Sequence, residues 1–483
     1  MKINIHIIRP LVLTMLVLTG FDASIFAQVV SIPDAGLNAA VREALQKPIG
    51  LLTEQDLLSL TNLNASSRNI GDVQGLESAR NLVSLNLHFN HLSNFALPGA
   101  LTNLTVLDLS ANSLTKCSFQ SGLMKLITLN LQGNLLTNLT LPAGPNGLSS
   151  FDLSENRFTS FNLPSNLTSL TSLDLSFNFP LTNVSLPNGL TNLTRLAILG
   201  NNTLADLNLA PGLTALETLD IDNNLLARVA LPAGMKSLVR LNLRANQLFS
   251  LTLPAGMTNL VDLLLDGNHL DSLTLPADLT KLAFLDITGN FMRNLTLPGS
   301  LTALTELHLP VNLLSSFTLP PGLTNLTTLD LFENALTSFT LPAGLTALTN
   351  LNLGVNQLTS LTVPPDATNL ITLFLIFDSQ LTTVILSEPL AATNLASTVA
   401  ALRAQGVSVF TYPLAVRMDT TRLTASEAFE FTLNGPPGIY TIFGSADLTA
   451  WNELGRTTNV LGRIVFTDSS AGLSARKFYR ARQ

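Results

Sequence analysis

The sequence is poor in charged residues and has a single cysteine. Only 12 % of its 483 residues are charged and the formal net charge is −7, so it lacks the basic surface that nucleic-acid-binding proteins use. We therefore expect no nucleic-acid partner. Cys117, the only cysteine, leaves no internal disulfide to form. It stands where other turns of the repeat described below carry an inward-facing leucine, which predicts a buried apolar side chain rather than a reactive thiol.

Beyond its N-terminus the sequence also lacks a long apolar segment. Although 46 % of the residues are hydrophobic, no later run reaches the roughly 18 residues that span a bilayer. The first residues are typical of a secretory signal peptide, with Lys2 and Arg9 in the positive region, an apolar region from Leu11 to Leu18 and a cleavage site before Gln28. We expect residues 1–27 to be removed, leaving no transmembrane segment, and the chain to be exported to the medium or the surface of the cell envelope. Export without disulfides favours a bacterial source.

Motifs that carry enzyme chemistry are absent. There is no nucleophile elbow, P-loop, dinucleotide-binding fingerprint or series of zinc ligands, so we expect neither catalysis nor a cofactor. His88 and His91 form a His-x-x-His pair, but no third ligand accompanies them, and surface histidines explain the pair better than a metal site. Asp152 and Asp174 stand on adjacent turns and could hold calcium, although repetition of a consensus accounts for both without a ligand.

What the sequence has in abundance is one phrase, Leu-x-x-Leu-x-Leu-x-x-Asn, which is the pattern of leucine-rich repeats. Residues 104–112 are an example. Its closing asparagine recurs every 22 residues, apart from two steps of 23, at Asn90, Asn112, Asn134, Asn156, Asn178, Asn201, Asn224, Asn246, Asn268, Asn290, Asn312, Asn334 and Asn356. Arg68 and Asp378 occupy the asparagine position at the two ends, so the register predicts fifteen turns.

These turns predict a mainly β fold, a leucine-rich repeat solenoid. A unit this short cannot bury its own apolar face and must stack on its neighbours. The Leu-x-Leu step has the period of a strand, so the stacked turns predict a parallel concave sheet with leucines inward. Each asparagine amide can donate to and accept from backbone groups that lack ladder partners. A second phrase, as in Leu248–Gly256, alternates Thr with Leu and ends near a proline, which predicts short extended convex segments.

Sequence outside the repeat predicts helical caps at both ends of the solenoid, because an uncapped turn would expose its leucines. We expect a helical N-terminal cap in residues 28–58, the solenoid in 59–386 and a C-terminal cap in 387–413, with a helix over 391–405 followed by a strand. Residues 414–483 lose the repeat and show short alternating stretches between turns, which predict a small β-sandwich module.

The predicted N-terminal helix places Leu37, Val41, Ala44 and Leu45 on one face, directly before the first turns. With the repeats, this cap resembles that of internalin-like bacterial leucine-rich repeat proteins over roughly residues 30–386. The resemblance implies a bacterial protein that adheres to host proteins through its concave face.

The C-terminal module has its own resemblance. Through Gly-Pro-Pro-Gly-Ile-Tyr at 435–440 and Phe-Tyr-Arg at 478–480 it is similar to β modules of exported bacterial proteins. Its Trp451, the sole tryptophan, suits a module core better than a platform for stacking on carbohydrate.

Charged and aromatic residues gather on one stretch of the predicted concave face. Early turns carry mostly Ser, Thr and Asn at the outward positions, whereas later turns carry a different set. This candidate ligand-binding patch comprises Arg195, Asp220, Asp222, Arg240, Arg244, Asp262, Asp266, Phe284, Glu306, His308 and Phe332. The phenylalanines favour a ligand, because an exposed aromatic ring is a typical binding anchor.

Cross-strand ion pairs are the alternative explanation of the charges. Asp222, Arg244 and Asp266 occupy the same position on consecutive turns, as do Arg240 and Asp262, so opposite charges would face each other without a ligand.

We therefore predict a non-enzymatic protein that recognises or adheres to a protein or glycan ligand through its concave face. The alternative is a structural spacer that presents the C-terminal module at the cell envelope.

Overall fold

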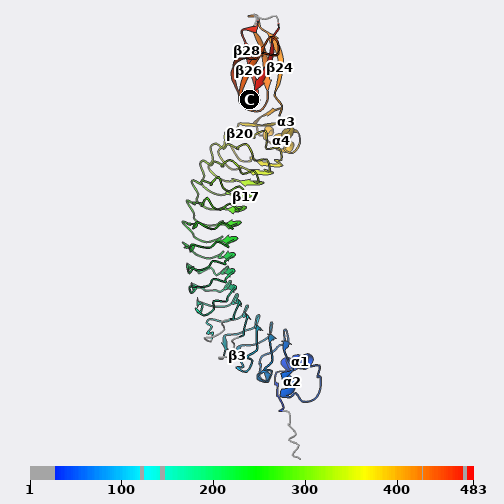
Figure 1. Cartoon of the computed structure of the whole chain (residues 1–483), viewed down its shortest axis with the longest axis vertical. Coiled ribbons are helices and arrows are strands. Elements are labelled where there is room, and N and C mark those ends of the chain that lie inside the picture. Colours follow the sequence, from blue (N-terminus) through cyan, green and yellow to red (C-terminus); the bar gives the residue numbers. More distant parts are fainter. Residues whose placement is uncertain (1–27, 120–124, 142–146, 427, 472–475) are drawn as a thin grey trace, which may run out of the picture.

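The computed structural model describes residues 28–119, 125–141, 147–426, 428–471 and 476–483. The predicted signal peptide, residues 1–27, lies outside the described residues. The chain forms a long curved solenoid with short helices near both ends and two small sheets beyond its C-terminal end (Figure 1). Within the described ranges, no helix has the length and apolar character needed to cross a membrane.

One parallel sheet of fifteen strands forms the concave face, as the repeat predicts. In spatial order the strands are β1 (Asn62–Asn64), β2 (Ser84–Asn86), β4 (Val106–Asp108), β6 (Thr128–Asn130), β7 (Ser150–Asp152), β9 (Ser172–Asp174), β11 (Arg195–Ala197), β13 (Thr218–Asp220), β14 (Arg240–Asn242), β15 (Asp262–Leu264), β16 (Phe284–Asp286), β17 (Glu306–His308), β18 (Thr328–Asp330), β19 (Asn350–Asn352) and β21 (Thr372–Phe374). Neighbouring strands pair in register, so that Leu241 lies between Leu219 and Leu263. Corresponding positions of successive turns therefore form continuous rows.

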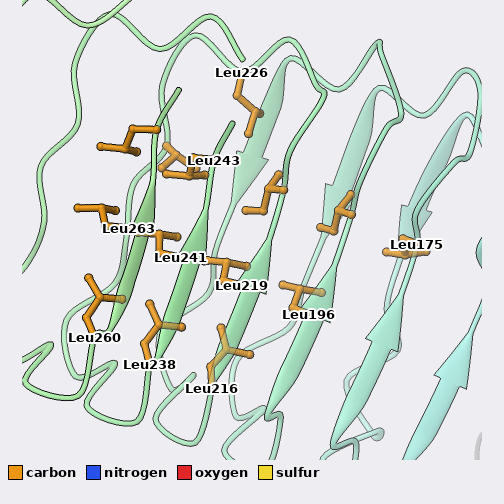
Figure 2. Packing of buried hydrophobic residues seen from close by; sticks show 14 of the residues in the cluster. Leu175, Leu196, Leu216, Leu219, Leu226, Leu238, Leu241, Leu243, Leu260 and Leu263 are labelled. Carbon is orange, nitrogen blue, oxygen red and sulfur yellow. The ribbon is translucent and has the colours of Figure 1, made fainter. Parts of the chain in front are cut away.

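The core consists of leucines stacked along the solenoid. Figure 2 shows two fully buried rows, one of Leu196, Leu219, Leu241 and Leu263 and another of Leu216, Leu238 and Leu260. A buried leucine contributes about 1.5–3 kcal/mol relative to an exposed one. Because each turn buries its leucines against both neighbours, one apolar cluster extends from the N-terminal cap to the C-terminal cap.

The asparagines connect each turn to the turn before it. The Asn112 side-chain amide donates to the carbonyls of Leu87 and Leu109, both at 3.0 Å, and its oxygen accepts from the Leu92 N–H at 3.0 Å. Equivalent contacts are made by Asn90, Asn134, Asn156, Asn178, Asn246, Asn268, Asn290, Asn312, Asn334 and Asn356. The amide thus satisfies buried backbone groups that the sheet leaves unpaired.

The two 23-residue steps interrupt this pattern. The Asn201 oxygen accepts from the Asn178 N–H at 2.7 Å, which is a different donor from that of the other turns. Asn224 still donates to the carbonyls of Ile198 and Ile221, but its buried oxygen has no hydrogen-bond partner within the described ranges. In the other turns this oxygen accepts a hydrogen bond from a backbone N–H of the preceding turn. The extra residue of the 23-residue step changes the position of that N–H.

Short parallel strands lie along the convex side, where the second phrase predicts extended chain. They are β3 (Asn94–Leu97) with β5 (Lys116–Phe119), then β8 (Ser160–Asn162), β10 (Asn183–Ser185) and β12 (Asp206–Asn208), and finally β20 (Ser360–Thr362), β22 (Thr383–Ser387) and β23 (Ser408–Tyr412). Cys117 on β5 is only 9 % exposed, and burial raises the pKa of its thiol to about 12. Such a thiol stays protonated at neutral pH.

The N-terminal cap begins with α1 (Ala35–Ala44), whose first turn is capped by Asp34 accepting from the Leu37 N–H at 2.9 Å. Two further elements follow, α2 (Glu54–Leu58) and the 3-10 helix η1 (Leu76–Ser78). Leu37 and Val41 are buried as predicted, but Ala40 is buried in place of Ala44, which is exposed. The helix ends at Ala44, so this residue lies beyond the apolar contact surface.

The C-terminal cap contains two helices instead of the single predicted helix. These are α3 (Glu388–Ala392) and α4 (Ala396–Ala404). The break lies at Thr393, whose backbone leaves the helical region, and at Asn394, whose side-chain amide donates to the Leu370 carbonyl of the last turn at 3.2 Å. The prediction of one helix was wrong because helical propensity does not register this tertiary contact.

Residues after the cap form two antiparallel three-stranded sheets. One contains β24 (Arg417–Leu423), β25 (Phe429–Asn434) and β28 (Arg463–Asp468), and the other contains β27 (Asn452–Asn459), β26 (Gly438–Ser445) and β29 (Phe478–Arg482). A small cluster that includes Phe431 and Tyr440 joins residues of both sheets. The sequence did not predict β24 and β27, which are edge strands of largely polar composition. Trp451 is half-buried, with the Arg480 guanidinium 4.4 Å from its ring centre.

Candidate functional site on the concave face

The candidate patch forms three rows that cross β11 to β18. The first strand position supplies Arg195, Arg240, Asp262, Phe284 and Glu306, which lie in one register row. The third strand position supplies Asp220 and His308. The position two residues beyond each strand supplies Asp222, Arg244, Asp266 and Phe332. Since neighbouring strands lie roughly 4.8 Å apart, members of one row on adjacent strands can touch.

Ion pairs join the basic and acidic residues of the first two rows. Arg240 lies between two carboxylates, with its guanidinium 3.6 Å from Asp220 and 3.3 Å from Asp262. Arg195 lies 3.9 Å from Asp220. These four residues form one connected charge network across β11, β13, β14 and β15. The pairing of Arg240 with Asp262 is the one that the repeat register indicates.

In the third row, Arg244 pairs with Asp266 at 2.5 Å, whereas Asp222 has no ion-pair contact within the described ranges. Burial, together with the negative charge of Asp220, raises the pKa of Asp222. Burial and the charge of Asp286 raise the pKa of Asp266 in the same way. Acidic groups outnumber arginines in the patch, five to three, so its carboxylates are only partly neutralised.

The aromatic residues are less exposed than the sequence suggests. Phe284 and Phe332 were predicted to be exposed rings, but both are half-buried. The ring of Phe284 lies 5.3 Å from that of His308, and the ring of Phe332 lies 6.2 Å from that of Phe374. Side chains on a concave sheet converge on one another, and each ring is therefore partly covered by the neighbouring turn.

Asp220 is likewise more buried than its outward position indicates, at 8 % exposure. It is enclosed by the arginines of the strands on either side, at the distances given above. His308 also contacts Glu306, whose carboxylate lies 3.1 Å from its Nε2. The structure thus brings nine of the eleven patch residues into contacts with one another, in three groups on one stretch of sheet. Asp222 is not part of these groups, and Phe332 pairs with Phe374 further along the face.

The other residues considered from sequence show internal contacts. The Nδ1 atom of His88 shares a hydrogen bond of 2.8 Å with the Ser110 hydroxyl. Asp152 accepts from the backbone N–H and the hydroxyl of Ser154 at 2.9 and 2.6 Å. Over the described ranges, no group of three or more potential ligand side chains is arranged to hold a metal ion.

Sequence reasoning missed an aromatic stack beside the concave face. His269 lies between Phe249 and Phe291, with ring centres 5.4 and 5.6 Å apart. The two phenylalanines are 61 % and 50 % exposed. In the sequence, His269 and Phe291 directly follow turn asparagines, and Phe249 is the third residue after one. The residue directly after the asparagine varies between turns, so the repeat gave little signal for this stack.

Comparisons with known proteins agree with this architecture. The family model described as BspA-type leucine-rich repeat region (six copies) matches residues 109–219 and 176–285, and that described as leucine-rich repeats (two copies) matches residues 324–366. None of the curated proteins matches the chain.

The solved structures that are similar in fold include two bacterial proteins. An internalin (inlF) from Listeria monocytogenes shares 25 % identity, with a TM-score of 0.52, over 66 % of this chain and 95 % of the internalin. YopM from Yersinia pestis, a leucine-rich effector protein, shares 26 % identity, with a TM-score of 0.50, over 70 % of this chain and 92 % of the effector. Together with the fifteen-stranded concave sheet, these matches support a leucine-rich repeat fold similar to that of bacterial leucine-rich repeat proteins.

Proposed function

We propose that this chain is an exported, non-enzymatic recognition protein that binds a protein or glycan through the concave patch. The observation that carries the proposal is the gathering of arginines, acidic residues and aromatic side chains on β11 to β18. The earlier strands of this face present mostly Ser, Thr and Asn, with Asp108, Asp152 and Asp174 as their only charged residues. Inward apolar residues, mainly leucines, build the core, so most of these outward residues are not needed to form the solenoid. Their concentration in one stretch supports a recognition role.

The arginines of the patch remain accessible although they are paired. The side chains of Arg195, Arg240 and Arg244 are 49 %, 38 % and 43 % exposed. A surface ion pair contributes only about 0–1 kcal/mol, so a ligand group can replace one partner at small cost. Because carboxylates are in excess, the complementary ligand carries cationic or hydroxyl donor groups, as basic protein segments and glycans do.

Family and fold likeness support an interaction role. The chain is similar to a BspA-type leucine-rich repeat region and to an internalin, and repeat solenoids use extended concave surfaces for binding. Export is part of the proposal, and it rests on the signal-like residues 1–27. The proposed domain order is signal peptide, N-terminal cap 28–58, solenoid 59–386, C-terminal cap 387–413 and a β-sandwich module 414–483.

A structural spacer is the second candidate. The ion pairs between Arg240 and Asp262 and between Arg244 and Asp266 favour it, because they satisfy charges without any ligand. In this alternative the rigid solenoid separates the C-terminal module from the N-terminal cap, an arrangement visible in Figure 1.

A binding array of proteins and glycans, probed with the purified chain, separates the two functions. Arg240→Ala and Phe284→Ala should each abolish binding of the recognised ligand, whereas Thr128→Ala, at the same row position on β6, should leave it intact. Loss of binding only in Trp451→Ala would place recognition in the C-terminal module. An array without any specific signal would support the spacer.

A further inference from the structure

The concave sheet ends in an open strand edge. β21 is its last strand and pairs with β19 alone. On the turn before, the Leu353 N–H donates to the last residue of β21 at 2.9 Å, and the Val355 N–H donates to the Ile376 carbonyl, two residues beyond β21, at 3.0 Å. The Thr349 carbonyl accepts two N–H groups from the β21 turn. The penultimate turn therefore uses these three backbone groups to hold the strand that follows.

The equivalent groups of the last turn are the Leu375 N–H, the Phe377 N–H and the Ile371 carbonyl. Within the described ranges none of the three makes a hydrogen bond to another residue. Unpaired donors and acceptors at a sheet edge are a template for another strand. Their spacing is that of a strand running parallel to β21, since this is the arrangement throughout the sheet.

A groove borders this edge between β21 and helix α4. It has a volume of about 420 Å³. Residues 371–376 line it on the strand side, and residues that include Thr398, Ala401 and Leu402 line it on the helix side. Two exposed apolar side chains lie at this edge: Ile371, which lines the groove and is 59 % exposed, and Phe377, which is 76 % exposed. Such a groove accepts the side chains of one extended segment.

We propose that an extended peptide segment of a partner protein adds to β21 as the next parallel strand, with an apolar side chain in the groove beside α4. Main-chain hydrogen bonds to Ile371, Leu375 and Phe377 would hold the segment, and the groove would select its side chain. This site is separate from the concave patch around Arg240. The volume of the groove favours a single strand over a second copy of the chain, whose complete turn would need far more space beside α4.

The chain itself supplies a suitable probe, the synthetic peptide of residues 346–356. In the solenoid this sequence already makes the required contacts to the preceding strand: the Asn350 N–H donates to the Thr327 carbonyl at 3.0 Å, and the carbonyls of Asn352 and Gly354 accept at 2.8 and 2.9 Å. A fluorescently labelled form, titrated with the full chain and followed by anisotropy, should bind saturably.

Two pairs of matched changes test the geometry. Ala401→Trp fills the groove and should weaken peptide binding at least about tenfold, whereas Ala404→Trp, exposed on the same helix outside the groove, should not. N-methylation of the peptide at Asn350 removes a donor that faces β21 and should also cost about tenfold or more, whereas N-methylation at Leu351, which faces away, should have little effect.

Arg240→Ala should leave peptide binding unchanged, so failure of this proposal is distinguishable from failure of the concave-patch function. Lack of saturable binding, or equal affinity for Ala401→Trp or for the Asn350-methylated peptide, would overturn the proposal. A dimer that Ala401→Trp converts to monomer, measured by light scattering, would overturn it as well, because a second copy would then occupy the edge.

Discussion

Replacing Asn268 by alanine should destabilise the solenoid far more than its small size suggests. The side chain is 3 % exposed, and it donates to the carbonyls of Leu243 and Leu265 at 2.9 and 3.0 Å and accepts from the Leu248 N–H at 3.1 Å. Alanine leaves all three backbone groups without this partner. At about 1–3 kcal/mol for each buried group left unsatisfied, and with some relaxation of the turn, we expect a loss of roughly 3–5 kcal/mol.

Urea denaturation followed by circular dichroism measures this loss. The matched control is Asn369→Ala, because Asn369 is exposed and donates to the Thr346 carbonyl at 2.7 Å, which water can replace. The control should lose no more than about 0.5 kcal/mol. If Asn268→Ala lost as little as Asn369→Ala, the asparagine ladder would not stabilise the stacked turns, and the reasoning would be refuted.

Two further predictions concern ionisable groups. Burial raises the pKa of Asp378 from 3.8 to about 6, so the folded state binds a proton more tightly than the unfolded state, and stability should fall as the pH rises from about 4 to above 6. Asp378→Asn should remove that pH dependence from melting curves. Above pH 6 it should also raise the free energy of unfolding by about 1 kcal/mol, because an amide can donate a hydrogen bond where the carboxylate cannot. An unchanged pH profile would contradict this prediction. The buried Cys117 thiol, with its pKa raised to about 12, should react with a thiol reagent at pH 8 at least about a hundredfold more slowly in the native than in the denatured chain. Equal rates would show that the thiol is accessible.

The fold could be predicted because the sequence repeats one physical solution many times. The spacing of the leucines and of residues such as Asn112 and Asn268 determines strand, turn and register together, and the fifteen-stranded sheet follows. Prediction failed where a single tertiary contact decides the structure. The helix break at Thr393 and Asn394 depends on a bond to the last turn, and the polar edge strand Asn452–Asn459 depends on its partner β26.

For the candidate patch, the rows and the pairing of Arg240 with Asp262 could be read from the repeat register. The burial of Asp220 and the half-burial of Phe284 could not, because they depend on how closely neighbouring turns converge on the concave side. The stack of Phe249, His269 and Phe291 involves positions outside the strand phrase, where the consensus gives no expectation of contact.

The most direct test of recognition by the concave face is to measure ligand affinity and melting temperature together for Arg240→Ala, Phe284→Ala and the control Thr128→Ala. For a ligand identified on the array, we predict that the first two substitutions weaken binding at least about tenfold, as expected for central interface residues, while the melting temperature stays near that of the unaltered chain. Unchanged affinity accompanied by a large fall in melting temperature would contradict the account, because the patch would then serve the stability of the solenoid.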